Sequence, residues 1–408
     1  MIGVRTMFAL ALALSLLAPV GAALSLAAED VKIALVAPLS GRWARQGQLK
    51  KMGADMAIDE INSTGGIKAL GGAKIVLREA DAGDSVEKAV SAAQRALGGR
   101  DKISAGIGSW LSSFTLGVTE VAERLQVPWF TLSYADSITE RGFKYTFQTS
   151  PVSSLQAEQA LDLVVDLAKK ANAPLKKAAL IGDNTAATVF FMKPLREKLL
   201  KAKGIELVVD EIWTPPLADA TAIVQKLRAG QPDIVFYGAT NFPDSIQVLQ
   251  KVKEFGIKSP FMAVGAWIVT PDYIKTVGKE LLDNIMAVVA AHPLKGQEDL
   301  VERFKKRTGE PFMTQDPLMT YAHVWIIKEA IERAKSADPK AIREAMTGLE
   351  ITSGPAAATL YPGKIKYDER GRRVGATPVI VQWQNGEPFT VVPANIATRP
   401  LVWHGTAK

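Results

Sequence analysis

Side chains able to bind a solute recur directly after the predicted strands of this chain. In the first half they are Trp43 and Arg45, then Trp110, Ser112 and Ser113, then Ser133 and Tyr134. In the second half they are Asp183 and Thr185, then Thr240 and Asn241, then Gly265 and Trp267. Ligands of open α/β sheets bind beyond the carboxyl ends of the strands. This mixture of hydroxyl, aromatic and charged groups suits a small solute that is partly apolar and partly charged.

Ser112 and Ser113 form the sharpest pair, because an apolar helical pattern over 112–125 follows them. One of the two serines is expected to be the N-cap of that helix. The free amides and the dipole at a helix start favour an anion, so a ligand carboxylate can bind there. A helix cap without any ligand is the alternative.

Two arginines and five aromatic residues stand in the same loops. Arg42 and Arg45 can clamp a carboxylate with two hydrogen bonds, or they can be solvated side chains that face a partner protein. The aromatic residues can line an apolar pocket, or they can pack in the core or between lobes; they are Trp43, Trp110, Tyr134, Phe242 and Trp267. Asp183 ends a predicted strand, where we expect it to stiffen the turn.

Strand patterns alternate with helical patterns along most of the chain, which predicts parallel sheets covered by helices on both sides. Strands are expected at 32–37, 74–79, 103–107, 129–132, 178–181, 206–212, 234–237, 261–264 and 285–289. Helices are expected at 53–61, 85–97, 112–125, 154–171, 193–203, 218–228, 244–255, 316–335 and 339–346. The segments 374–383 and 389–392 flank Asn385-Gly386, which predicts a β-hairpin.

These patterns form two blocks, and crossings between them are expected at 148–151, 290–293 and 359–366. The predicted boundaries are 28–147 and 291–360 for one lobe, and 148–290 and 361–408 for the other. A mature chain of about 380 residues fits two domains.

The N-terminus has the pattern of a secretory signal over 1–27: Arg5 precedes an apolar run over 7–20, and small residues follow. Cleavage after Ala23 or after Ala27 fits equally well. The apolar run is short for a membrane anchor. The chain has no cysteine, which excludes a disulfide and a lipid-anchored lipoprotein. These features predict a periplasmic protein without a membrane anchor.

Composition and motifs favour binding over catalysis. The formal charge of +7 is spread along the chain, without the basic stripe that nucleic-acid binding requires. His292, His323 and His404 are far apart and do not have metal-ligand spacing. A nucleophile elbow, a phosphate-binding loop and a complete dinucleotide fingerprint are all missing from the sequence. We therefore expect no metal, no cofactor and no enzyme activity.

Several segments resemble the periplasmic leucine/isoleucine/valine-binding proteins, the solute receptors of branched-chain amino-acid ABC transporters. The segments are Ala37-Pro38-Leu39-Ser40-Gly41, Ala57-Ile58-Asp59-Glu60-Ile61-Asn62, Gly65-Gly66-Ile67, Asp81 with Asp84, Gly108 with Ser112-Ser113, Thr139-Glu140-Arg141-Gly142-Phe143, Tyr237-Gly238 and Phe261-Met262. The resemblance implies a type I periplasmic-binding fold, in which two Rossmann-like lobes joined by three hinge crossings close on the ligand. It also implies docking on an ABC permease in the membrane.

The resemblance further implies the ligand contacts. Ser112 and the loop Ser133–Ala135 would bind the ligand carboxylate, while the loops around Asp183, Tyr237–Asn241 and Gly265 would face it from the second lobe. Members that bind amino acids often have a glutamate near the position of Gly265, where it holds the ammonium group, whereas this chain has Gly265-Ala266-Trp267. A hydrophobic or aromatic carboxylate is therefore the first expectation, and a branched-chain amino acid is the second.

Two choices stay open at this point. Asp136 or Asp244 can still supply a partner for an ammonium group. The protein can serve an importer or act as a periplasmic sensor subunit for a signalling system. A hydrolase would need a pair of nucleophile and base that the sequence does not present.

Overall fold

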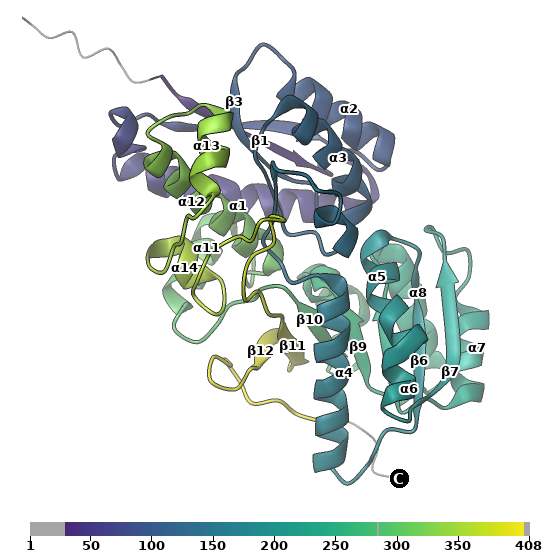
Figure 1. The fold of residues 1–408 in the computed structure, drawn as a ribbon. Helices are drawn as coiled ribbons and strands as arrows, with labels where there is room; N and C mark the ends of the chain where they lie inside the picture. The colour runs from purple at the N-terminus through teal and green to yellow at the C-terminus, as the bar shows by residue number, and fades with distance from the viewer. Residues whose placement is uncertain (1–28, 284, 404–408) are drawn as a thin grey trace, which may run out of the picture.

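The computed structural model describes residues 29–283 and 285–403, and it places their strands in two separate sheets (Figure 1). The predicted signal segment 1–27 lies outside the described residues. In the part of the chain that is described, none of the helices combines the length and apolar character needed to cross a membrane.

The first sheet has five parallel strands in the order β2-β1-β3-β4-β5. The strands are β1 (Val31–Ala37), β2 (Ile75–Asp81), β3 (Ile103–Gly108), β4 (Trp129–Thr131) and β5 (Thr146–Gln148). Around this sheet lie α1 (Ala44–Ser63), α2 (Val86–Leu97), α3 (Ser112–Leu125), α11 (Glu298–Thr308), α12 (Gln315–Ala334), α13 (Pro339–Met346) and α14 (Gly354–Thr359). Short 3-10 helices are η1 (Gly41–Trp43), η2 (Lys68–Leu70) and η3 (Asp136–Thr139).

The second sheet has seven strands in the order β12-β11-β10-β9-β8-β6-β7. The strands are β6 (Lys177–Asp183), β7 (Glu206–Trp213), β8 (Ile234–Gly238), β9 (Phe261–Val264), β10 (Ile285–Val289), β11 (Val379–Gln384) and β12 (Glu387–Val392). Its helices are α4 (Ser153–Lys170), α5 (Ala186–Pro194), α6 (Leu200–Ala202), α7 (Thr221–Gly230), α8 (Phe242–Glu254), α9 (Asp272–Val277) and α10 (Lys279–Leu282), with a π-helical turn η4 (Leu195–Leu199) and a 3-10 helix η5 (Ala266–Val269). Strands β6 to β10 pair in parallel, while β11 and β12 form an antiparallel hairpin.

Each sheet is buried on both faces, as the continuous apolar runs predicted. In β1, Ile33 and Leu35 pack in a core with α1 and α12, whereas Ala34 and Val36 pack on the opposite face with α2 and α3. The second sheet likewise separates a core beneath α7 and α8 from another beneath α4 and α5. This alternation follows from the two-residue period of a strand.

The chain passes between the two sheets after β5, after β10 and after α14 (Figure 1). The predicted two-lobed α/β fold is therefore confirmed. The turn Asn385-Gly386 has φ values of 56° and 88°, which confirms the predicted hairpin, although its first strand begins at Val379 instead of 374.

Some helix bounds were predicted wrongly, and some elements of the structure were not predicted. Helix α1 begins at Ala44, nine residues earlier than expected, because glycine lets it approach its neighbours: a Cβ atom on Gly47 would lie 1.9 Å from the Pro38 carbonyl oxygen. The helix expected over 193–203 begins at Ala186 and contains Pro194 and the π-helical turn. Helices α11 and α14 and the short strand β5 were not predicted.

Candidate ligand-binding site

A small cavity of about 40 Å³ lies between the two lobes. Its lining residues are Trp110, Leu111, Ser112, Leu132, Ser133, Tyr134, Ala187, Thr188, Thr240, Val264, Gly265, Ala266, Trp267 and Gln315. A buried water needs roughly 10–15 Å³, so the cavity has room for about three waters. A solute of leucine's size therefore requires the lobes to move apart before it can enter.

Ser112 organises the wall that the first lobe contributes. It is the first residue of α3, and its Oγ accepts hydrogen bonds from the amides of Tyr134 and Ala135 at 3.0 and 3.1 Å. The predicted N-cap role of Ser112 or Ser113 is wrong, because the N-cap position belongs to Leu111, whose side chain cannot cap. Among the described residues no hydrogen bond uses the Ser112 hydroxyl proton, which is thus available to an acceptor on a ligand.

The Ser133 hydroxyl, in contrast, donates its proton to another group of the protein. Its Oγ donates to the Trp110 carbonyl oxygen at 2.9 Å and lies 2.7 Å from Thr115 Oγ1, which in turn accepts from the Ser109 amide. Trp110 has a φ of 77°, a region that non-glycine residues seldom adopt. The surrounding hydrogen bonds hold this strained conformation, and such strain is typical of binding loops.

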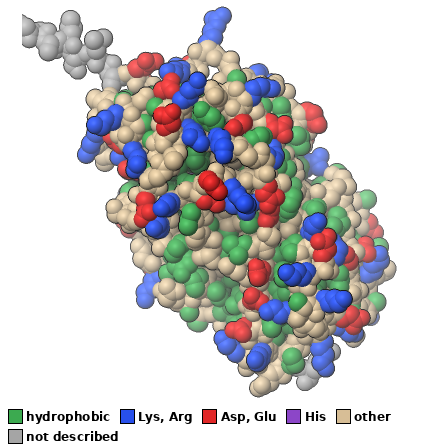
Figure 2. Space-filling view, in the orientation of Figure 1, with side chains coloured by type: hydrophobic (Ala, Val, Ile, Leu, Met, Phe, Trp, Pro, Cys, Tyr) green, Lys and Arg blue, Asp and Glu red, His purple; other side chains and the backbone are tan. Residues whose placement is uncertain are grey.

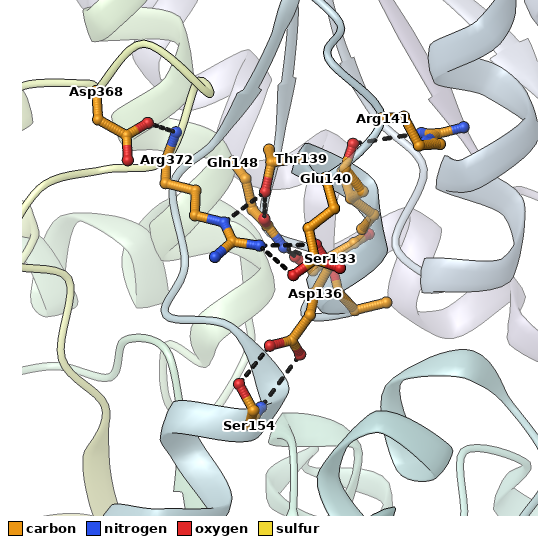
Figure 3. A network of polar contacts seen from close by, with 11 residues as sticks. Ser133, Asp136, Thr139, Glu140, Arg141, Gln148, Ser154, Asp368 and Arg372 are labelled. Carbon is orange, nitrogen blue, oxygen red and sulfur yellow. Dashed lines mark hydrogen bonds and ion pairs between the residues drawn. The ribbon is translucent and has the colours of Figure 1, made fainter.

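A polar network fixes the loop that carries Ser133, Tyr134 and Ala135 (Figure 3). Gln148 Nε2 donates to the carbonyl oxygens of Ser133 and Ala135 at 2.8 and 3.1 Å. Arg372, from the third crossing, donates to Thr139 Oγ1 and to the Asp136 carbonyl oxygen at 2.7 and 2.9 Å. The first and third crossings therefore support the binding loop from behind.

Asp136 is occupied by the same network and does not line the cavity. Its carboxylate accepts hydrogen bonds from the backbone amide and the hydroxyl of Ser154, at the start of α4 (Figure 3). Burial raises its pKa. The sequence left Asp136 open as a partner for an ammonium group, and the structure instead places it in the link between the two lobes.

The wall of the second lobe is apolar around Gly265. Gly265 has a φ of 93°, and a Cβ atom there would lie 3.3 Å from Tyr134 Cε2 and 3.4 Å from Trp267 Cδ1. The Trp267 indole donates to the Val264 carbonyl oxygen at 2.6 Å, so its polar edge is already satisfied. Gly265, where the resemblance led us to look for a glutamate, is thus enclosed by two aromatic rings.

Asp183 supports this wall from beneath. Its buried carboxylate accepts from the amides and hydroxyls of Thr185 and Thr240 at 2.6 to 3.1 Å. Burial raises the pKa of Asp183, and these four hydrogen bonds oppose that rise. The expectation that Asp183 stiffens a turn is confirmed by these contacts, and Thr240 is held in place beside the cavity.

Among the described residues that line the cavity none is charged. A buried pair, Lys50 and Asp316, lies outside the lining, with Nζ and Oδ1 3.6 Å apart and both side chains 1% exposed. Burial raises the pKa of Asp316 to about 6, against the attraction of Lys50. Asp244, the other candidate for an ammonium group, accepts hydrogen bonds from Trp213 and Asn241.

The cavity brings together seven of the predicted site residues: Trp110, Ser112, Ser133, Tyr134, Thr240, Gly265 and Trp267. The other eight, Trp43, Arg45, Ser113, Ala135, Asp183, Thr185, Tyr237 and Asn241, lie outside its lining. Trp43 packs edge-on against Phe114, and Arg45 is bound by carboxylates of the protein. Tyr237 packs against the Trp267 ring from the core, with 5.2 Å between ring centroids.

Sequence reasoning missed Gln315 at the start of α12. Its Oε1 accepts from the Tyr134 hydroxyl at 2.6 Å and from the Ala290 amide at 2.8 Å, so it joins the cavity wall to the second crossing. The remaining unpredicted lining residues are Leu111, Leu132, Ala187, Thr188, Val264 and Ala266. Of these, only Thr188 could have been predicted, because it is a polar residue shortly after β6. The others have the types expected of ordinary core or loop residues.

Comparisons with known proteins agree with this architecture. A family model described as periplasmic binding protein matches residues 30–388. The Leu/Ile/Val-binding protein homolog 7 of Brucella abortus (strain 2308) is 28% identical over 383 residues, which cover 90% of this chain and 92% of the relative. Homolog 8 of Brucella melitensis biotype 1 is also 28% identical, over 91% of this chain and 92% of that protein.

Solved structures share the fold at lower identity. LivJ of Streptococcus pneumoniae, described in complex with isoleucine, has a TM-score of 0.75 at 21% identity and covers 88% of this chain and 98% of its own. A fatty acid ABC transporter substrate-binding protein of Thermomonospora curvata also has a TM-score of 0.75, at 17% identity, over 89% of this chain and 91% of its own. The chain therefore belongs to the periplasmic binding protein family, as the resemblance to leucine/isoleucine/valine-binding proteins predicted.

Proposed function

We propose that this protein is the periplasmic solute-binding component of an ABC importer and that it captures a hydrophobic or aromatic carboxylate between its lobes. A branched-chain amino acid is the second candidate. The closed protein would deliver its ligand to a permease in the membrane. In this proposal the protein is a binding module and not an enzyme, and its N-terminal segment 1–27 directs it to the periplasm. The lobes would comprise 28–147 with 291–360, and 148–290 with 361–408.

One observation supports the choice of ligand. Among the described residues that line the cavity, Ser112 has a hydroxyl proton free to donate, and none of the side chains is charged. The Ser112 proton and the amides at the start of α3 can meet a carboxylate. An α-ammonium group would have no carboxylate partner in the lining, and burying an unpaired charge is costly. A carboxylate with an apolar remainder meets both conditions.

The chain's relatives support the same function class. The Brucella relatives are named as Leu/Ile/Val-binding protein homologs, and one solved neighbour is described as a fatty acid ABC transporter substrate-binding protein. The surface also fits a soluble carrier of small molecules, because acidic and basic side chains are interspersed over the face shown in Figure 2 and no basic stripe is visible there.

A thermal-shift screen tests this proposal. Purified mature protein is heated with leucine, isoleucine or valine, and separately with aliphatic, aromatic and keto acids. A ligand at a hundred times its dissociation constant stabilises the folded protein by about 2.7 kcal/mol, so a true ligand stands out. We expect stabilisation by organic acids. Stabilisation by leucine alone would contradict the proposed ligand class, and no response to either class would contradict the proposed function.

A further inference from the structure

Arg45 connects the two lobes at the beginning of α1. Its Nε donates to Asp272 Oδ2 at 2.7 Å, and its Nη1 and Nη2 donate to the two carboxylate oxygens of Glu310 at 2.8 and 2.7 Å. Asp272 begins α9, between β9 and β10 of the second sheet. Glu310 follows α11, whose Phe304 is buried in the core of the first sheet. Arg45 and Glu310 therefore belong to one side of the cleft and Asp272 to the other.

The three side chains differ in burial in a way that assigns them different roles. The Glu310 side chain is 11% exposed, Arg45 is 28% exposed and Asp272 is 41% exposed. A two-point contact with a carboxylate fixes the plane of a guanidinium group. Glu310 thus holds Arg45 in one orientation within its own lobe, and Nε donates to the more exposed carboxylate of Asp272 in the other lobe.

Charged side chains also join the lobes where the chain crosses between them: Arg372, in the segment after α14, pairs with Glu140 at 3.3 Å, and the Asp136 carboxylate accepts from the Ser154 amide. Outside the three crossings, the ion pair of Arg45 with Asp272 is the only one in residues 29–283 and 285–403 that joins an element of the first sheet to an element of the second. A hydrogen bond between the lobes, from the Ala186 amide to Ser113 Oγ at 3.2 Å, is longer and uncharged. Opening the lobes would break the Arg45–Asp272 contact and leave the Arg45–Glu310 contact intact.

We propose that Arg45 is a latch residue, oriented by Glu310, that favours the closed arrangement of the lobes by binding Asp272. The sequence suggested that Arg45 clamps a ligand carboxylate, whereas the geometry points to a carboxylate of the opposite lobe. A contact made only in the closed state raises the closed-to-open ratio, and with it the apparent affinity of any ligand that binds the closed state. The effect on ligand affinity rests on the proposed function, whereas the effect on the ratio does not.

The expected size of the effect is modest, because partly exposed ion pairs contribute up to about 1 kcal/mol. Arg45→Gln should lower the closed-to-open ratio by about two- to fivefold. Asp272→Asn should lower the ratio by a similar factor. The double variant Arg45→Gln with Asp272→Asn should lower it little further, because both changes remove the same contact. Glu310→Gln should lower the ratio less, since it disturbs only the orientation of Arg45. High salt should reduce the difference between wild type and Arg45→Gln.

Arg42→Gln is the matched control. It removes the same charge three residues away, in η1, and Arg42 lies over the Trp43 ring, without an ion pair among the described residues. Circular dichroism melts of each variant separate a loss of the latch from a loss of folding.

Double electron–electron resonance provides the readout. The chain has no cysteine, so spin labels attach only at introduced cysteines. Glu87→Cys on α2 and Gln225→Cys on α7 are exposed and lie in different lobes. The two distance populations give the closed-to-open ratio without added ligand. A fall in Arg45→Gln and Asp272→Asn, absent in Arg42→Gln, is expected.

An unchanged ratio in Arg45→Gln, or an equal fall in Arg42→Gln, would overturn the latch. Because the ratio is measured without ligand, this result is distinct from a failure of the thermal-shift screen. A protein that binds none of the tested acids or amino acids can still show the latch, and a protein that binds them can still lack it.

Discussion

The two walls of the cavity differ in chemistry although they come from sheets of the same class. The first lobe places hydroxyl groups and the start of α3 at the cavity, with Ser112 bridging two amides of the loop after β4. The second lobe places Val264, Gly265, Ala266 and Trp267 there. Its acidic residue Asp183 lies behind the cavity wall, where its carboxylate accepts hydrogen bonds from Thr240. The difference indicates that a ligand presents its polar end to the first lobe and its apolar body to the second.

The largest expected effect comes from making the second wall polar. Gly265→Glu places a side chain in a conformation that favours glycine, 3.3 Å from Tyr134 Cε2. Backbone strain of this kind costs about 1–3 kcal/mol, and the side chain would hold the lobes apart. Isothermal titration calorimetry should show that the affinity for the organic acid falls by about tenfold or more.

Gly256→Ala is the control for that experiment. Gly256 also has a positive φ, 67°, but a Cβ atom there meets no other atom within 4 Å. It therefore reports the backbone cost alone, and it should leave ligand affinity unchanged. Tight binding of leucine by Gly265→Glu would break the comparison, because it would show that the second wall can accept an ammonium partner.

A smaller effect on ligand affinity is expected from the first wall. Ser112→Ala leaves the amides of Tyr134 and Ala135 without their acceptor, and each unsatisfied buried group costs about 1–3 kcal/mol. Both the free energy of unfolding, measured by urea denaturation, and ligand affinity should fall. Ser113→Ala removes only the contact to the Ala186 amide of the other lobe. It should leave the stability of the protein nearly unchanged, and equal losses in both variants would contradict the distinct role of Ser112.

The smallest effect concerns pH. Burial lowers the pKa of His292 to about 3 and that of His323 well below 6.5, and neither residue lines the cavity. Below pH 6.5 both histidines are protonated in the unfolded chain but stay neutral in the folded chain. The free energy of unfolding should therefore fall by up to about 1.4 kcal/mol per pH unit and histidine on acidification.

The window for this measurement is pH 7.5 to 6. As the pH approaches 6 and falls below it, the raised pKa values of Asp316 and Asp183 oppose this loss of stability, because the folded chain binds those protons before the unfolded chain does. Ligand affinity should stay constant between pH 7.5 and 6. Tyr134 lines the cavity, and burial raises its pKa, so its hydroxyl stays protonated throughout this range. His292→Asn should reduce the slope of stability against pH. A matching pH dependence of affinity would show that a titrating group contacts the ligand.

The fold could be predicted from the sequence because strand and helix periods are local properties. The pattern over 112–125 gave the bounds of α3 correctly, and Asn385-Gly386 gave the hairpin. The early start of α1 could not be predicted, since it depends on how closely Gly47 approaches Pro38 in the folded chain. Long-range packing of this kind leaves no periodic signal in one sequence.

The cavity was predictable only in outline. Loops after strands identified Ser112, Tyr134 and Trp267, because parallel strands bring their carboxyl ends to one edge. The same rule also selected Arg45 and Tyr237, which use their polar groups within the protein. Whether a side chain contacts a ligand or another residue depends on partners that are distant in sequence, as Glu310 is from Arg45.

The most direct measurement compares two ligands that differ only in the α-ammonium group. Isocaproate and leucine share one carbon skeleton, as do hydrocinnamate and phenylalanine. The unpaired ammonium group would be buried against Gly265 and Trp267, so calorimetric titration should give the deaminated acid of at least one pair an affinity about tenfold or more above that of its amino acid. Tighter binding of leucine than of isocaproate, together with tighter binding of phenylalanine than of hydrocinnamate, would contradict this account of the site.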